Sequence, residues 1–290
     1  MKKIYGIIPP IITPFDSDGR VDVETLKREV EYYIESGVHG LSFAGSTGEG
    51  STLNSDELYL GISTIRSMTE MPLVCGIIRN CSKDALEAGL AVKDAGADAL
   101  MVTPKFYFSN DDDGNYAFYE EICRTVELPV IVYNVISANP ISAELLAKMS
   151  DIPHMFGVKQ SVGGLHALGE TLRLCENKLQ VFGAQDDLCY VSFAMGAVGS
   201  ISAVHAVFPR ESVVMWNAVQ EGDLLTARRI QQRTMPVVKL CGQVPFPNGY
   251  REATSQLGCP VGYARHPLMP VSTEYSARMA QCLTENGFIA

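Results

Sequence analysis

The chain alternates between short, almost wholly hydrophobic runs and longer stretches in which hydrophobic residues recur every three or four positions. Hydrophobic runs are typical of parallel strands buried on both faces, and the recurring spacing is typical of the helices that cover them. The runs predict strands over residues 6–12, 40–44, 73–77, 99–102, 130–133, 155–159, 180–182 and 199–202. Eight strand–helix units therefore predict an α/β fold, a (β/α)8 TIM barrel, with a doubly wound sheet as the alternative.

Local signals mark where helices begin and end. Asn54 precedes a helical pattern and is followed three residues later by Glu57, the arrangement of a capping box. Gly37, Gly96 and Gly196 each separate a helical pattern from the next strand, where glycine can adopt the left-handed conformation that ends a helix.

The pattern changes after Gly222, where only helices are predicted, over about 223–241, 249–257 and 273–286. We therefore expect two parts: a barrel over residues 1–222 and a C-terminal helical segment over residues 223–290. Barrel chains often use such a segment for contacts between subunits.

Composition narrows the class of protein. Hydrophobic residues make up 47% of the chain and charged residues 19%, so a large core is available and disorder is excluded. The net charge of −10 argues against nucleic-acid and membrane partners. The eight cysteines form no C-x-x-C pair, and no stretch approaches the ~20 apolar residues of a membrane span. We expect a soluble cytoplasmic protein with buried, free thiols.

The strand over residues 155–159 ends in Lys159, and the neighbouring strand ends in Tyr133. The active sites of βα barrels lie at the C-terminal ends of the strands. Burial disfavours the charged form of a lysine, and the neutral amine is the nucleophile that forms a Schiff base. Adjacent strands are about 4.8 Å apart, so the Tyr133 phenol can serve the same site as an acid/base. The alternatives are that the Lys159 amine reaches solvent or pairs with a carboxylate, and that Tyr133 is only a packing residue.

The segment from Gly45 to Gly50 contains three glycines and two hydroxyl residues after another strand. Such a loop can bind a carboxylate through N–H and O–H groups, although an ordinary turn would look the same. The five histidines show no metal-binding spacing and no G-x-G-x-x-G follows a strand, so we expect neither a metal nor a cofactor.

Taken together, these segments resemble one family. Thr13-Pro14-Phe15, Gly45-Ser46-Thr47-Gly48-Glu49, Val102-Thr103-Pro104, Tyr133-Asn134 and Gly157-Val158-Lys159-Gln160-Ser161 occur in the order and spacing of the dihydrodipicolinate synthase / N-acetylneuraminate lyase family of class I pyruvate-dependent aldolases. The resemblance covers nearly the whole chain and implies a homotetrameric (β/α)8 barrel.

The resemblance also implies roles for individual residues. Lys159 would form the imine with pyruvate or another 2-oxo acid, and Tyr133 would be the general acid/base. Ser46 and Thr47 would bind the carboxylate, and Thr47 would also help to relay protons. The remaining implied site residues are Gly48 and Ile201 beside the 2-oxo acid, Tyr107 offered to a neighbouring subunit, and Gly183, Asp186 and Asp187 at the hydroxylated part of the substrate.

The chain departs from the synthase branch after Tyr133-Asn134. That branch reads x-P-x-R-T-G, and its arginine holds the carboxylate of the aldehyde partner. Here Ile136 replaces the proline and Ala138 replaces the arginine. The loss of a charge-assisted contact, typically worth about 1.5–3 kcal/mol, argues against lysine biosynthesis. Arg79 and Arg251 lie in other segments, and the sequence alone aims neither at the site.

These observations favour a metal-independent lyase that reversibly cleaves a 2-oxo acid, N-acetylneuraminate or a 2-oxo-3-deoxy sugar acid, into pyruvate and an aldehyde. The chain is expected to lie closer to the lyase and sugar-acid aldolase branches than to the synthase branch. The alternatives are 4-hydroxy-tetrahydrodipicolinate synthesis, 2-oxo acid dehydration and, from another class, a non-catalytic metabolite-binding relative.

Overall fold

Eight parallel strands form the centre of the protein. The structure is a computed structural model and describes residues 2–290. The strands are β1 (Gly6–Ile7), β2 (Leu41–Phe43), β3 (Leu73–Ile77), β4 (Ala99–Val102), β5 (Val130–Asn134), β6 (Met155–Gln160), β7 (Gln180–Gly183) and β8 (Gly199–Ser200). They pair in the order β1-β8-β7-β6-β5-β4-β3-β2. A parallel bridge between Pro10 and Ser42 joins the two ends of this order. The sheet therefore curls into the predicted barrel.

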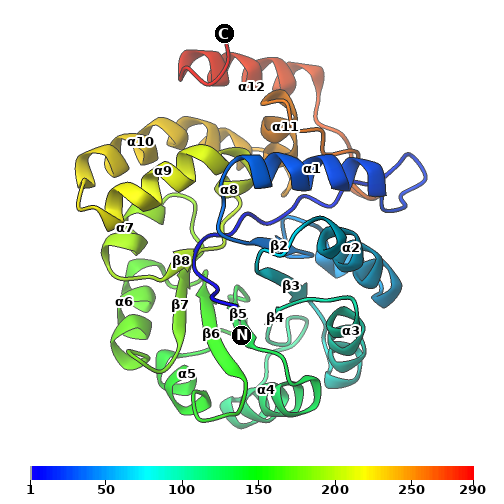
Figure 1. Ribbon diagram of the computed structural model, residues 1–290, viewed down its shortest axis with the longest axis vertical. Helices are drawn as coiled ribbons and strands as arrows, with labels where there is room; N and C mark the ends of the chain where they lie inside the picture. Colours follow the sequence, from blue (N-terminus) through cyan, green and yellow to red (C-terminus); the bar gives the residue numbers. More distant parts are fainter. Residues whose placement is uncertain (1) are drawn as a thin grey trace.

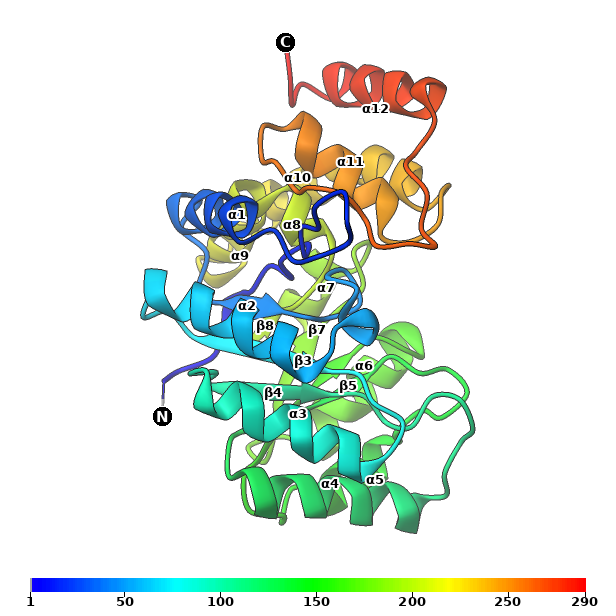
Figure 2. The same cartoon turned by 90° about the vertical axis from the view of Figure 1, so that its right-hand side faces the viewer.

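Helices surround the strands in Figure 1. The helices of the barrel are α1 (Val23–Glu35), α2 (Ser55–Met68), α3 (Ser82–Asp94), α4 (Asp112–Val126), α5 (Ala143–Met149), α6 (Gly164–Leu174), α7 (Cys189–Ala194), α8 (Val204–Val207) and α9 (Pro209–Gln220), with a 3-10 turn over Gly50–Thr52. Three further helices follow, α10 (Leu224–Cys241), α11 (Asn248–Gln256) and α12 (Thr273–Glu285). Figure 2 shows these three helices gathered on one side of the barrel, with α12 farthest from the strands.

The predicted helix boundaries are present. The Asn54 side chain accepts a hydrogen bond from the Glu57 N–H, and the Glu57 carboxylate accepts one from the Asn54 N–H. Gly37, Gly96 and Gly196 all have positive φ angles, of 74°, 101° and 103°. Within residues 2–290, no helix is long and apolar enough to cross a membrane.

The first strand is shorter than the sequence pattern suggests. It ends at Ile7 because Pro9 and Pro10 have no N–H to donate to a sheet. The chain nevertheless stays beside β2, since the Ile11 N–H donates to the Ser42 carbonyl (2.8 Å) and the Ser42 N–H donates to the Pro9 carbonyl (3.0 Å).

Hydrophobic side chains form two shells. The larger shell lies between the strands and the helices, and the smaller one fills the inside of the barrel. The inner shell consists of Ile4, Ile8, Val74, Ala99, Met101, Ile131, Tyr133, Phe182 and Ile201. Tyr133 is the one inner-shell side chain that carries a polar group, which places a phenol at the C-terminal end of a packed core.

Candidate active site

Lys159 and Tyr133 lie side by side at the C-terminal ends of β6 and β5. They are register partners in the sheet, so both side chains point toward the inside of the barrel. The Lys159 amine lies 4.0 Å from the centre of the Tyr133 ring. The two residues are only 5% and 4% exposed. Among residues 2–290 no carboxylate forms an ion pair with Lys159, which leaves its amine available to a ligand.

The next register pair, Asn134 and Gln160, lies directly beside the same site. Asn134 and Gln160 follow Tyr133 and Lys159, and strand alternation turns their side chains outward. The Asn134 amide donates to the Gln160 side-chain carbonyl (3.0 Å). It also donates to the Ile141 carbonyl (2.8 Å) and accepts from the Ile141 N–H (2.9 Å). The ends of both strands are therefore locked by amide contacts.

A hydroxyl from β2's loop reaches the phenol. The Ser46 hydroxyl lies 3.0 Å from the Tyr133 hydroxyl, within hydrogen-bonding distance. Ser46 is partly exposed, whereas Thr47 is buried. Because Ser46 is partly exposed, this hydrogen bond links the Tyr133 hydroxyl to solvent, and a proton can pass between them. The structure thus brings Lys159, Tyr133 and Ser46 together.

The glycine loop (residues 45–50) is tightly folded. Glu49 has a positive φ of 53°, and a β-carbon at Gly50 would overlap the Ala44 carbonyl. The N–H groups of Gly48, Glu49 and Gly50 are used inside the loop, by the carbonyls of Gly45 and Ser46. In the part of the chain described, the N–H groups of Gly45, Ser46 and Thr47 have no acceptor, so they are the donors that remain for an anion.

A buried ion pair between Arg251 and Glu49 holds the glycine loop in place. Arg251 on α11 donates to the Glu49 carboxylate (2.8 Å) and to the Thr13 carbonyl (3.0 Å), and the Thr13 hydroxyl donates to the Gly48 carbonyl (2.6 Å). Burial raises the pKa of Glu49, and the charge of Arg251 opposes that rise. The C-terminal helical segment therefore fixes the position of the loop.

Glu29 on α1 is a second buried carboxyl group near this loop. One of its oxygens accepts from the Ile12 N–H (2.8 Å) and from the Tyr33 hydroxyl (2.9 Å), and the other has no partner within residues 2–290. Burial raises the pKa of Glu29 to about 8, so the group is mostly protonated at neutral pH.

His205 lies behind β8 and is fully buried. Its ring nitrogens lie 2.8 Å from the hydroxyls of Ser212 and Ser200. Burial, together with the charge of Lys159, lowers the pKa of His205 to about 3. The ring is therefore neutral, and it adds no charge next to the amine.

The other site residues implied by the resemblance occupy different settings. Ile201 is buried in the inner shell, and its N–H donates to the Gly183 carbonyl (3.0 Å). Tyr107 is 76% exposed and stacks edge-on against Phe108. The Asp186 carboxylate accepts from the hydroxyls of Ser202 and Tyr250, both at 2.5 Å, and from the Val204 N–H at 2.8 Å.

The two arginines that could replace a synthase-type cation are both engaged. Arg79 donates to the carbonyls of Ile78 (3.0 Å) and Leu53 (2.5 Å), and Arg251 is bound to Glu49. Ala138 itself is exposed and uncharged.

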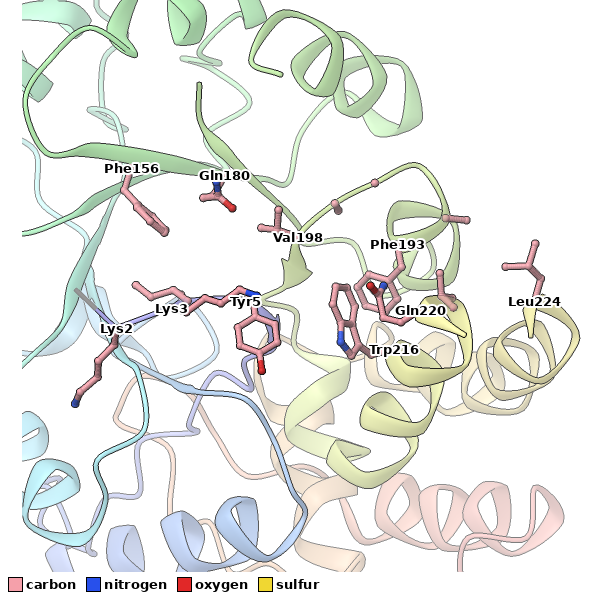
Figure 3. Close-up of a pocket in the computed structure, with 15 residues that line it drawn as sticks. Lys2, Lys3, Tyr5, Phe156, Gln180, Phe193, Val198, Trp216, Gln220 and Leu224 are labelled. Atoms are coloured by element: carbon pink, nitrogen blue, oxygen red, sulfur yellow. The ribbon is translucent and has the colours of Figure 1, made fainter. Parts of the chain in front are cut away.

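A large cavity lies at the other end of the barrel. A cavity of about 960 Å³ opens at the N-terminal ends of the strands, where Figure 3 shows Tyr5, Trp216, Phe193 and Phe156 around it. Its lining shares no residue with the lysine site. In a βα barrel this end is associated with stability rather than with chemistry.

Comparison with known proteins agrees with this geometry. Residues 3–286 match the dihydrodipicolinate synthetase family. The chain belongs to this family. It is 32% identical over 293 residues to a 4-hydroxy-tetrahydrodipicolinate synthase of Nitratidesulfovibrio vulgaris, covering 99% of this chain and all of that one. It is 30% identical over 283 residues to the synthase of Methanothrix thermoacetophila, covering 97% and 96%.

Solved structures of the family show the same fold. The chloride-inhibited dihydrodipicolinate synthase from Acinetobacter baumannii, crystallised with pyruvate, has a TM-score of 0.93 at 27% identity, over 99% of this chain and all of that one. The protein is thus a pyruvate-dependent class I lyase of this family. These relatives are named as synthases, so they do not support the expected closeness to the lyase and sugar-acid branches.

Proposed function

We propose that this enzyme reversibly cleaves a 2-oxo acid, a sialic acid or a 2-oxo-3-deoxy sugar acid, into pyruvate and an uncharged aldehyde. The observation that carries the proposal is the Lys159 amine beside the Tyr133 phenol, with no ion-pair partner within residues 2–290. An amine and a proton carrier in one buried mouth are the groups that imine chemistry needs. No metal or cofactor takes part in the proposed steps.

The mechanism uses the imine as an electron sink. The neutral Lys159 amine attacks the C2 ketone, and Tyr133 donates the proton with which the hydroxyl leaves as water. The Tyr133 phenolate then takes the proton of the C4 hydroxyl, so the C3–C4 bond breaks and its electron pair moves into the iminium to give an enamine. Protonation of the enamine at C3 and hydrolysis of the imine release pyruvate and return the free amine.

Ser46 supports this chemistry in two ways. Its hydroxyl, hydrogen-bonded to Tyr133, can carry the proton between the phenol and water. Its N–H, with those of Gly45 and Thr47, has no acceptor within residues 2–290 and is available to the substrate carboxylate. The relay role implied for Thr47, and contacts from Gly48, Ile201 and Gly183, remain predictions. Because three donors within the protein occupy Asp186, we propose that it positions the loop after β7 rather than binding substrate.

The loop after β5 offers no cation, which favours an aldehyde partner that carries no carboxylate. Ala138 offers no charge, and Arg79 and Arg251 are both bound to groups of the protein. A carboxylate placed there would lose its hydration without gaining a cation.

A second candidate is 4-hydroxy-tetrahydrodipicolinate synthase, which condenses pyruvate with aspartate semialdehyde. The names of the relatives support this candidate better than they support the first. A 2-oxo acid dehydratase would use the same imine. The residue at position 138 is the reason for placing the lyase first.

One comparison of rates separates the two candidates. Pyruvate release from 2-oxo-3-deoxygluconate and from N-acetylneuraminate is measured against condensation of pyruvate with aspartate semialdehyde. We expect kcat/KM for the semialdehyde to be at least about tenfold below that of the better lyase substrate, because about 1.4 kcal/mol of lost contact is tenfold. Condensation that rivals every lyase substrate would establish the synthase instead.

We also propose that the enzyme is a homotetramer and that residues 223–290 form a helical segment distinct from the barrel. The exposed, stacked rings of Tyr107 and Phe108 support a contact between subunits, since large apolar side chains in one place favour association. Sedimentation of the purified protein tests the oligomeric state.

A further inference from the structure

Two asparagines are buried together beside the mouth of the barrel. Asn139 lies in the loop after β5 and is 3% exposed, and Asn115 lies in the first turn of α4 and is 2% exposed. The Asn115 amide donates to the Asn139 side-chain carbonyl (2.9 Å), and the Asn139 amide donates back to the Asn115 side-chain carbonyl (3.3 Å). The Asn139 amide also donates to the Lys105 backbone carbonyl (2.9 Å).

This pair connects two loops that leave neighbouring strands. The loop after β4 holds Lys105 and Tyr107, and the loop after β5 holds Ala138 and Asn139. On its other side the first loop is held by Asn80, whose side-chain carbonyl accepts from the N–H groups of Phe106 (3.0 Å) and Tyr107 (3.1 Å). The backbone that carries Tyr107 is therefore fixed from both flanks.

The loop after β5 is equally constrained. Asn134 joins its two ends through both hydrogen bonds to Ile141, and the Asn139 N–H donates to the Ile136 carbonyl (3.0 Å). Between these anchors only Ser137, Ala138 and Pro140 are exposed. The side chains that a ligand can reach in this loop are thus presented by a short, rigid turn.

Burying two amides is costly unless each satisfies the other. A pair of apolar residues could fill the same space without that requirement. Removal of one amide leaves its partner buried and unsatisfied, so the arrangement holds the two loops in one relative position.

We propose that the Asn115–Asn139 pair positions the loop after β5 for the aldehyde part of the substrate and leaves the imine chemistry to Lys159 and Tyr133. The inference rests on the proposed function, in which the position of Ala138 faces the aldehyde. Asn139 is a positioning residue: it touches Lys105 and Asn115, and it acts on specificity through the loop.

The test compares two reactions of the same enzyme. Exchange of the pyruvate methyl protons in D2O, followed by NMR, needs only the imine and its proton carrier. Cleavage of 2-oxo-3-deoxygluconate also needs the aldehyde end to be placed. We expect Asn139→Ala to keep exchange within about threefold of the wild type while KM for cleavage rises at least tenfold. Thermal unfolding verifies that the variant is folded.

Asn248→Ala is the matched control. Asn248 is 4% exposed and donates to the Met269 carbonyl (2.8 Å), so this change also removes a buried asparagine contact, but in the C-terminal segment. We expect it to leave the ratio of cleavage to exchange unchanged. If Asn139→Ala does not fold, Asn115→Ala breaks the same pair from α4.

Equal losses of exchange and cleavage would overturn the proposal, because they would assign the pair a general structural role. An unchanged KM would overturn it as well. If the wild type instead condenses aspartate semialdehyde, the proposed function fails, and the pair is then tested by KM for the semialdehyde against the same exchange rate.

Discussion

The Lys159 amine faces the ring of Tyr133 at 4.0 Å because the two residues are partners in the β5–β6 register. An amine over an aromatic face interacts favourably with the ring's electron density, so this contact holds the Lys159 side chain against Tyr133. Imine formation consumes the neutral amine, and the phenol next to it is the group that can exchange the proton. One pair of neighbouring strands therefore supplies both the nucleophile and its acid/base.

Lys159 is expected to carry the covalent intermediate. Incubation with pyruvate and borohydride should reduce the imine and leave a stable adduct, which peptide mapping by mass spectrometry locates. Lys159→Ala should fold and lose both the label and activity by several orders of magnitude, whereas Lys105→Ala should keep both. A label on Lys105 or Lys239 in the wild type would show that the lysine is misassigned.

Tyr133→Phe should keep the packing of the inner shell and remove only the proton carrier. We expect turnover to slow by roughly 10²–10⁴-fold, the usual contribution of a positioned acid/base. Ser46→Ala should give a smaller loss, and Ser46→Thr should restore activity because a hydroxyl again lies beside the phenol. Near-normal turnover by Tyr133→Phe would point to another proton carrier, with Tyr107 the first to test.

Glu29 should make the protein less stable as pH rises. Its pKa is raised by burial to about 8, above the ordinary carboxyl value, so the folded state holds a proton that the unfolded state has released. The stabilising contribution of protonated Glu29 is fully present below the pKa of the unfolded state. It is lost as pH rises to about 8, and the free energy of unfolding then falls by at most about 1.4 kcal/mol per pH unit.

Glu29→Gln tests this linkage, since an amide keeps the acceptor for Ile12 and Tyr33 and does not titrate. Urea unfolding between pH 5 and pH 9 should show the variant gaining stability relative to the wild type as pH rises. Glu120→Gln, at an exposed pair with Arg124, should show no such trend. Parallel curves for Glu29→Gln and the wild type would contradict the prediction.

The sequence predicts the barrel well because its signals are local. The bounds of β3 and β4 agree with the hydrophobic runs, since both strands are buried throughout and their ends coincide with turns. The first strand was predicted too long, because hydrophobicity continues through Pro9 and Pro10 although they cannot join a ladder.

The sequence likewise predicts only part of the active site. Lys159 and Tyr133 could be placed from the sequence because each ends a recognisable strand and neighbouring strands share an edge. The sequence does not predict Arg251 as a support of the glycine loop, since its partner Glu49 is 202 residues away, and it does not predict Glu29 as a buried carboxyl group. One signal was available: Glu29 lies three residues after Leu26 and four before Tyr33, on the buried face of α1.

The Arg251–Glu49 pair has a consequence for the order in which the molecule is made. The glycine loop leaves the ribosome early, but the arginine that holds it arrives about two hundred residues later. Until α11 docks, Glu49 lacks the Arg251 ion pair, and the loop is held by its own turns and by the Thr13 hydroxyl. The eight strands can therefore close before the glycine loop has its ion pair, so we expect a nascent barrel to be catalytically inactive.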